Sequence, residues 1–114
     1  MAFKTAVRLN KRVALYVPST VDVDVSVNSS EEVAAAARFL SALFGGATAT
    51  EASGFWVSDE RGLVSEAVTI VYAYGGAEAV EAALDSIEAY AVALRERMRQ
   101  EAVSVEIGNE LLIF

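Results

Sequence analysis

The chain has 114 residues, a formal net charge of −7 and a hydrophobic content of 54%, which together predict one acidic domain (residues 1–114) able to bury a core. It contains no cysteine and no histidine, so disulfides, thiolate nucleophiles, zinc–thiolate sites and the commonest general base are excluded. Its acidic balance is the reverse of the basic footprint of a nucleic-acid-binding protein, so nucleic acid is not an expected partner.

No targeting or membrane segment is predicted. Residues 1–17 lack a long apolar core followed by a small-residue cleavage site, and the chain has no run of about 18 apolar residues. We therefore expect a cytoplasmic protein that does not cross a membrane. Any metal would have to be a hard cation held by carboxylates, and we expect neither a metal nor a cofactor.

The first predicted strand is the apolar run Val13–Val17, which ends at the only proline, Pro18. Residues 6–9 before it form an extended arm or a short edge strand. In the next stretch, "TVDVDVSVN", valines alternate with Asp22, Asp24 and Ser26, which is typical of a half-exposed strand or an extended arm. An alternative is that the two aspartates bind a divalent cation, but no third acidic ligand is placed nearby, so the strand is favoured.

A helix is predicted to open at Ser29 and to end at Phe44. Ser29 and Glu32 have the spacing of a capping box. The stretch "LFGGAT" could be a phosphate-binding loop only if its glycines led into a helix N-terminus, and here they follow a helix. We predict instead that a left-handed Gly45 or Gly46 ends the helix and delivers Thr48 and the 54–56 segment to one end of the fold.

The middle of the chain predicts a hairpin and then a second helix. Phe55–Ser58 leads into a polar loop and then into a β-rich run from Leu63 to Tyr74. One face of that run is bulky and includes Glu66, and the other is slimmer and suits the close approach of a helix. Apolar residues then recur at helical spacing from Val80 to Met98. A strand over 103–107, a turn at 108–109 and a short strand over 110–114 complete the chain.

The order strand, helix, strand, strand, helix, strand is that of the ferredoxin-like βαββαβ fold. We therefore predict an α+β protein with an antiparallel sheet, two helices on one face, an extra N-terminal arm and a C-terminal hairpin. The other sheet face would be apolar, aromatic and bare in a monomer. We expect a homo-oligomer, a dimer or higher, in which a second subunit or a bound molecule covers that face.

Four stretches in this order, "YVPST", "LFGGAT", "GFWVSDERGLVSE" and "QEAVSVEI", resemble a family of small bacterial and mobile-element proteins. The resemblance spans about residues 16–107. It brings no settled activity and so implies no catalytic residue, but it implies a mobile-element or defence and counter-defence context. It also implies that six residues belong together: Gly45, Gly46, Thr48, Gly54, Trp56 and Glu66.

Two candidate site residues leave distinct alternatives open. Trp56 is the only tryptophan, and it either fills the core or an interface or stacks on the ring of a ligand. Glu66 stands mid-strand on an apolar face, where an unpaired carboxylate is costly. It therefore either pairs with an arginine such as Arg12, Arg38 or Arg61, or acts in a pocket as a hydrogen-bond acceptor or general acid/base. The candidate ligand-binding residues are Tyr16, Thr48, Trp56, Glu66, Tyr72 and Tyr74.

These features favour a non-catalytic, homo-oligomeric binding protein that holds a small ligand or a partner protein, in a mobile-element or defence context. An aromatic sheet face beside a poor catalytic inventory is the reason for this preference. One alternative is a protein–protein interaction module in counter-defence. Another is a metal-independent hydrolase or isomerase that uses Glu66 with Tyr16, Tyr72 or Thr48.

Overall fold

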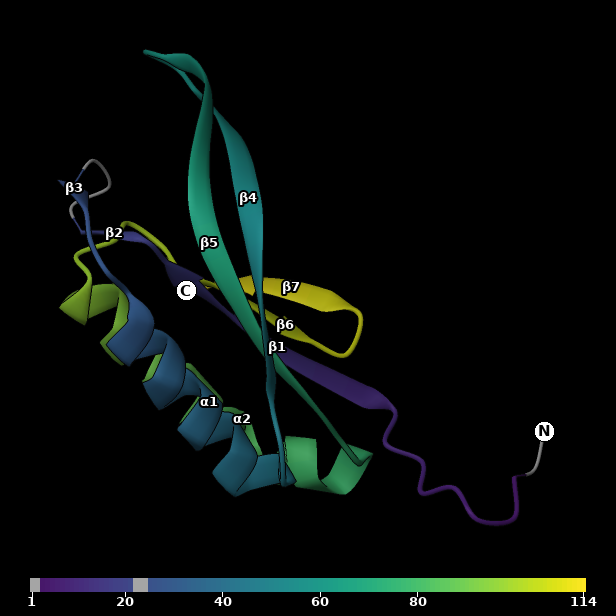
Figure 1. The fold of residues 1–114 in the computed structure, drawn as a ribbon. Coiled ribbons are helices and arrows are strands. Elements are labelled where there is room, and N and C mark those ends of the chain that lie inside the picture. The colour runs from purple at the N-terminus through teal and green to yellow at the C-terminus, as the bar shows by residue number, and fades with distance from the viewer. Residues whose placement is uncertain (1–2, 22–24) are drawn as a thin grey trace.

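The computed structural model describes residues 3–21 and 25–114, which fold into an antiparallel sheet with helices on one side (Figure 1). Within these residues the main sheet has five strands in the order β4-β5-β1-β6-β7. Its strands are β1 (Lys11–Pro18), β4 (Thr48–Ser58), β5 (Gly62–Gly75), β6 (Ser104–Ile107) and β7 (Glu110–Ile113), and the helices are α1 (Ser30–Phe44) and α2 (Ala77–Arg97). The predicted α+β class and the C-terminal hairpin, β6–β7, are confirmed.

Both helices pack on the same face of the sheet, and the core lies between them (Figure 1). Alternate side chains of β1, Val13, Leu15 and Val17, are fully buried there, because successive strand residues point to opposite faces. Each such burial contributes roughly 1.5–3 kcal/mol. Small side chains in the same layer let the helices approach the sheet closely: Ala36, Ala73, Ala83 and Ala91.

Strand β5 has the two unlike faces that its sequence predicts. Val71 and Ala73 are buried against the helices, whereas Tyr72 is half-buried and Tyr74 is exposed. The bulky residues of β5 therefore lie on the sheet face that the helices leave open. Among the described residues, no helix is long and apolar enough to cross a membrane.

The start of α1 differs from the predicted capping box. Ser29 makes no side-chain capping bond; instead Asn28 Oδ1 accepts a hydrogen bond of 3.0 Å from the Ser30 N–H. Glu32 faces the end of α2, where Arg97 Nη2 lies 2.9 Å from Glu32 Oε2. The capping box is wrong because this ion pair engages the carboxylate that would have reached back to the cap.

The end of α1 agrees with the prediction. Gly45 has φ of 92°, in the left-handed region, and its N–H donates a hydrogen bond of 2.8 Å to the Ser41 carbonyl. Such a residue closes a helix at low cost because glycine has no Cβ. The "LFGGAT" stretch is thus a helix end.

The segment after Pro18 is not one alternating strand. Its described parts form two-residue strands, β2 (Thr20–Val21) and β3 (Val25–Ser26), which pair antiparallel with each other and apart from the main sheet. Asp22 and Asp24, the candidate cation ligands, lie outside the described residues. Alternation requires only extended backbone, so it did not show that the chain reverses here.

The β4–β5 hairpin is longer than predicted, because β4 begins at Thr48 and not at Phe55. Each residue of β4 pairs with β5, from Thr48 opposite Tyr72 to Ser58 opposite Gly62. This continuous pairing overrides the weak strand propensity of the alanines and of Gly54. The hairpin projects well beyond the rest of the sheet (Figure 1), and the molecule measures 53 × 26 × 22 Å.

We expect Gly75→Ala to lower the free energy of unfolding by about 1–3 kcal/mol, measured by urea denaturation. A Cβ at Gly75 would lie 2.7 Å from Phe44 Cδ1 and 3.1 Å from Val80 Cγ2, so the helix-to-sheet contact would have to open. The control is Gly46→Ala, where a Cβ meets no atom within 4 Å. This control should leave stability unchanged or raise it by up to about 1 kcal/mol. Equal effects of the two substitutions would contradict the tight contact at Gly75.

Candidate functional site

The open sheet face is assembled by the strand register. Tyr16 pairs with Ile70, Ala14 with both Tyr72 and Glu106, and Gly54 with Glu66, so these side chains share one face. This is the face that the helices do not cover. Residues that are far apart in the sequence are therefore brought together on one surface.

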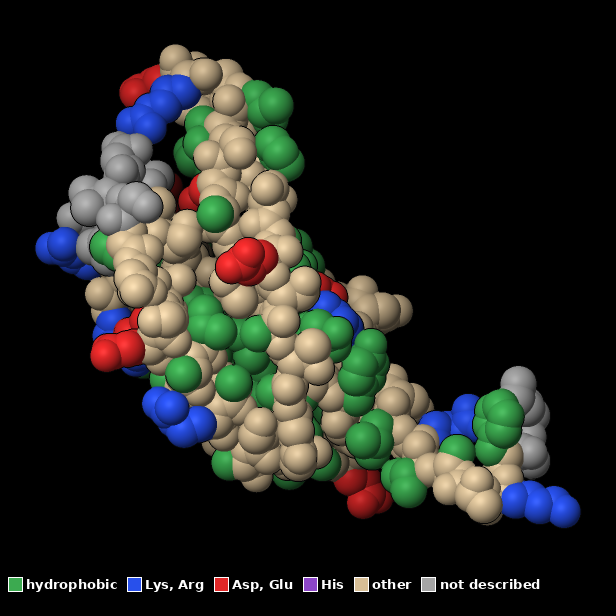
Figure 2. Space-filling model, in the orientation of Figure 1, with side chains coloured by type: hydrophobic (Ala, Val, Ile, Leu, Met, Phe, Trp, Pro, Cys, Tyr) green, Lys and Arg blue, Asp and Glu red, His purple; other side chains and the backbone are tan. Residues whose placement is uncertain are grey.

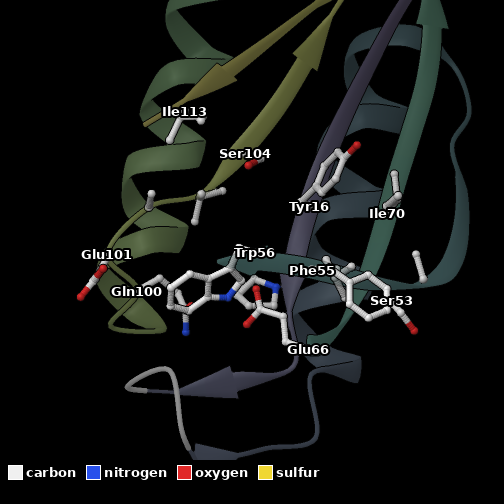
Figure 3. A pocket seen from close by; sticks show the side chains of 16 residues that line it. Tyr16, Ser53, Phe55, Trp56, Glu66, Ile70, Gln100, Glu101, Ser104 and Ile113 are labelled. Carbon is white, nitrogen blue, oxygen red and sulfur yellow. The ribbon is translucent and has the colours of Figure 1, made fainter. Parts of the chain in front are cut away.

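A cavity of about 600 Å³ lies on this face, where the β4–β5 hairpin leaves the sheet (Figure 3). Its walls come from β1, β4, β5, β6 and β7 and from residues 100–103, which precede β6. The described residues that line it include two carboxylates, Glu66 and Glu101, and no lysine or arginine. The cavity is therefore partly aromatic, partly aliphatic and negatively charged.

Three predicted site residues, Tyr16, Trp56 and Glu66, line this cavity together. The other three are placed elsewhere on the open face. Thr48 pairs with Tyr72 at the end of the hairpin opposite to Trp56, and the Tyr74 ring packs edge-on against Tyr72 at 6.2 Å between centroids. The expectation that Thr48 and the 54–56 segment reach one end of the fold is wrong. Both lie in β4, which runs from Thr48 to Ser58.

Glu66 has room for its side chain because its cross-strand neighbour is a glycine. A Cβ at Gly54 would lie 3.7 Å from Glu66 Cγ. Two of the three arginines considered as its partners are placed elsewhere. Arg12 pairs with Glu106, with 3.4 Å between Nε and Oε2, and Arg38 lines a different hollow on the helical side with Arg97. Glu66 itself lines the cavity.

Tyr16 is held by a short hydrogen bond. Its hydroxyl donates to Glu106 Oε1 at 2.6 Å, and this bond, together with burial, raises the pKa of Tyr16 above its ordinary value of 10.0. The Arg12 guanidinium that pairs with Glu106 also lies over the Tyr72 ring, 4.1 Å from its centroid. These contacts link β1, β5 and β6 on the open face.

Residues 100–104 form a wall that the sequence did not single out as a site. Gln100 Nε2 donates hydrogen bonds to the carbonyls of Thr20 at 2.8 Å and Met98 at 3.1 Å, which fastens this loop to β2. Gln100, Glu101 and Ser104 all line the cavity. In the sequence, these residues belong to the "QEAVSVEI" stretch, which resembles a family of proteins but did not indicate a binding or catalytic role for any of them.

Trp56 stands at the mouth of the cavity, with 42% of its surface exposed. In Figure 3 its ring lies between Glu66 and the Gln100–Glu101 loop, and the Tyr16 hydroxyl points away from both Trp56 and Glu66. Tyr16 therefore presents its ring to the cavity. Within the described residues, no group of three or more acidic side chains is placed to hold a metal ion.

The rest of the hairpin end is also apolar and exposed. Phe55, Val57 and Leu63 are 63%, 77% and 68% exposed. Figure 2 shows hydrophobic side chains near the end of the hairpin, where it projects from the body of the protein. An exposed apolar projection of this kind is unfavourable in water.

No protein-family model and no curated protein sequence matches the chain. Two solved structures share its fold. One is a phage SAM lyase in complex with S-methyl-5′-thioadenosine, with a TM-score of 0.69, 18% identity, and coverage of 99% of this chain and 95% of that chain. The other is a phage SAM lyase in the apo state, with a TM-score of 0.70, 20% identity, and coverage of 100% and 95%. At these identities the likeness shows the fold.

The comparison contradicts the interpretation of the chain as a non-catalytic binding protein, because the structures that share its fold are those of an enzyme. The poor catalytic inventory of the sequence suggested otherwise, since it lacks histidine and cysteine. That inference assumed a reaction that needs a protein nucleophile or a strong general base. The phage source of both structures agrees with the mobile-element context.

The raised pKa of Tyr16 makes stability depend on alkaline pH. A tyrosine whose folded-state pKa exceeds its unfolded value contributes fully below about pH 10, and the contribution is lost as the pH rises through the raised value. We expect Tyr16→Phe to flatten the loss of unfolding free energy above about pH 10, measured by urea denaturation across a pH series. Burial also raises the pKa of Tyr90, so Tyr90→Phe is the matched control. In this control the contribution of Tyr16 to the loss of unfolding free energy above about pH 10 should remain. An unchanged slope in Tyr16→Phe would contradict the assignment.

Proposed function

We propose that the chain is a lyase that cleaves S-adenosylmethionine and releases S-methyl-5′-thioadenosine, with the substrate bound in the cavity of the open sheet face. The observation that carries this proposal is the meeting of Tyr16, Trp56 and Glu66 in one cavity. The likeness of the whole fold to a SAM lyase bound to S-methyl-5′-thioadenosine supports it.

The cavity suits such a ligand in size and chemistry. Small-molecule sites have volumes of roughly 300–1,000 Å³ and combine apolar walls with a few polar groups. The Trp56 ring offers a flat surface on which an adenine can stack. S-adenosylmethionine carries a positive sulfonium and a positive ammonium, which the carboxylates of Glu66 and Glu101 attract. The net charge of −7 also favours the approach of a cationic molecule.

The reaction requires little chemistry from the protein. The bond between the sulfonium and the γ-carbon of the amino-acid part breaks, and the sulfur keeps the electron pair and becomes the neutral thioether of the product. The substrate's own carboxylate supplies the electron pair that the γ-carbon loses, which closes a lactone without water. The protein then needs to fold the substrate into that geometry and to exclude water, and positioning alone supplies a large rate increase.

Glu66 and the aromatic rings have distinct parts in this proposal. Glu66 holds the positively charged or hydroxyl-bearing part of the substrate, and Trp56 holds the adenine. The charge on sulfur disappears as the bond breaks, so the site needs to orient the sulfonium without binding it too tightly. Aromatic faces attract a cation more weakly than a buried carboxylate does, and Tyr16 supplies such a face.

We also propose that a second copy of the chain covers the apolar hairpin end and narrows the mouth of the cavity. The exposed side chains of Phe55, Val57 and Leu63 support this, since Phe55 lines the cavity and Val57 and Leu63 pair with each other next to Trp56. A ferredoxin-like classification is supported by the order β4-β5-β1-β6, to which β7 adds an edge strand. The resemblance to mobile-element proteins and a cytoplasmic location, where S-adenosylmethionine is made, are part of the same proposal.

The direct test is incubation of the purified protein with S-adenosylmethionine and quantification of S-methyl-5′-thioadenosine by mass spectrometry. We expect product well above the spontaneous rate, and Glu66→Gln should lower the rate at least about 100-fold, since it removes a charge that acts on the substrate. Glu51→Gln is the matched control, because Glu51 is an exposed carboxylate of the same hairpin on the opposite face. A wild-type rate equal to the spontaneous rate would overturn the proposal.

The oligomer has its own test by light scattering after size exclusion. We expect the wild-type chain to run as a homo-oligomer and Val57→Asp to shift it toward the monomer. Val57 is 77% exposed, and a charge introduced at this position would be buried in the contact between subunits. Glu60→Gln in the adjoining turn should leave the mass unchanged. A monomeric wild-type protein would contradict the covering of the hairpin by a second copy.

A further inference from the structure

The polar cluster behind Tyr16 has a role that the cavity alone does not explain. Glu106 does not line the cavity, yet both of its carboxylate oxygens are engaged on the open face. Oε1 accepts the Tyr16 hydroxyl at 2.6 Å, and Oε2 lies 3.4 Å from Arg12 Nε. Arg12 is itself placed over the Tyr72 ring at 4.1 Å. Arg12 therefore holds one oxygen of the Glu106 carboxylate, and the other oxygen accepts the hydrogen bond from Tyr16.

The hydrogen bond determines what Tyr16 presents to a ligand. The hydroxyl proton is committed to Glu106, and the hydroxyl points away from Trp56 and Glu66 (Figure 3). Only the ring of Tyr16 is then turned toward these cavity residues. The 2.6 Å separation is that of a charge-assisted O–H···O⁻ bond, and such a bond moves electron density toward the ring that donates it. A more electron-rich ring attracts a cation more strongly to its face.

We propose that Glu106 is a positioning residue that acts through Tyr16: it fixes the Tyr16 ring as a cavity wall and strengthens the preference of the cavity for a cationic ligand. This rests on the proposed function in that the cation is the sulfonium of S-adenosylmethionine. The product is neutral at sulfur, so the same arrangement favours substrate over product. Tyr16 and Glu106 thus contribute to specificity and to product release.

A purely structural role for the same bond makes a different prediction. If the bond only joined β1 to β6, its loss would lower the stability of the protein and would weaken all ligands alike. If Glu106 acted only by its own charge, Tyr16→Phe would have no effect on ligand preference, because this substitution leaves the charge of Glu106 in place. The proposal requires that the preference for a cation depend on both residues together.

The test compares two ligands that are not cleaved. Sinefungin carries a protonated amine at the position of the sulfonium, and S-adenosylhomocysteine is neutral there. Both have the nucleoside and the amino-acid part, so the ratio of their affinities reports the preference for charge. The single tryptophan, Trp56, lines the cavity, and its fluorescence provides the binding signal. S-methyl-5′-thioadenosine serves as a third ligand that lacks the amino-acid part.

We expect the wild-type protein to prefer sinefungin, and this preference to fall roughly threefold to tenfold in Glu106→Gln and in Tyr16→Phe. The double variant should show no further fall, because the two residues act as one unit. Glu110→Gln, an exposed carboxylate on β7, is the matched control and should keep the wild-type preference. Circular dichroism and urea denaturation show whether each variant is folded.

Three results would overturn the inference while the proposed function stands. They are binding of both ligands without preference, a parallel loss of both affinities in the variants, and a preference that survives in Tyr16→Phe but not in Glu106→Gln. If the wild-type protein binds none of the three ligands, the proposed function and this inference both fall.

Discussion

The placement of side chains in this protein depends on one constraint: successive residues of a strand point to opposite faces of the sheet, and helices cover only one of these faces. Along β5, Val71 and Ala73 are committed to the core, so the residues between them must face the other way. The same rule applies to β1 and β6, and it places Tyr16, Glu66 and Glu106 on a single surface. A shift of register by one residue would move Glu66 to the other sheet face and turn Val71 and Ala73 away from the helices. The hydrophobic core and the candidate site are thus two results of one alignment.

The second determinant is the length of the β4–β5 hairpin. A shorter hairpin would end at the sheet edge and would leave the open face flat. Here the pairing continues from Thr48 to Ser58, and the projecting part carries Trp56 and Glu66 to the cavity. Gly54 leaves room beside Glu66. The hairpin and the loop before β6 thus place the carboxylates of Glu66 and Glu101 at one cavity, outside the apolar core.

Much of the fold was predictable because its signals are local. The helix stripe from Val80 to Met98 and the left-handed Gly45 each depend on neighbours within a few residues. The capping box at Ser29 failed because Glu32 pairs with Arg97, a residue distant in sequence. The paired strands β2 and β3 were missed because alternation does not reveal a reversal.

The candidate site was only partly predictable, for the same reason. Tyr16, Trp56 and Glu66 were conspicuous residue types on an apolar face. The Gln100–Ser104 wall consists of ordinary loop residues whose importance comes from tertiary contacts. Glu106 was an alternating polar residue in a short strand, and nothing local linked it to Tyr16. The non-catalytic interpretation counted reactive side chains, whereas the solved structures that share the fold are those of an enzyme.

The bond between Tyr16 and Glu106 also joins residues that are 90 positions apart in the chain. Closing a loop of this length costs entropy, which the rest of the fold has to offset. The site therefore needs β1 and β6, from the two ends of the chain, to be paired. A ligand bound there would stabilise the entire fold by mass action, from the first strand of the sheet to the last.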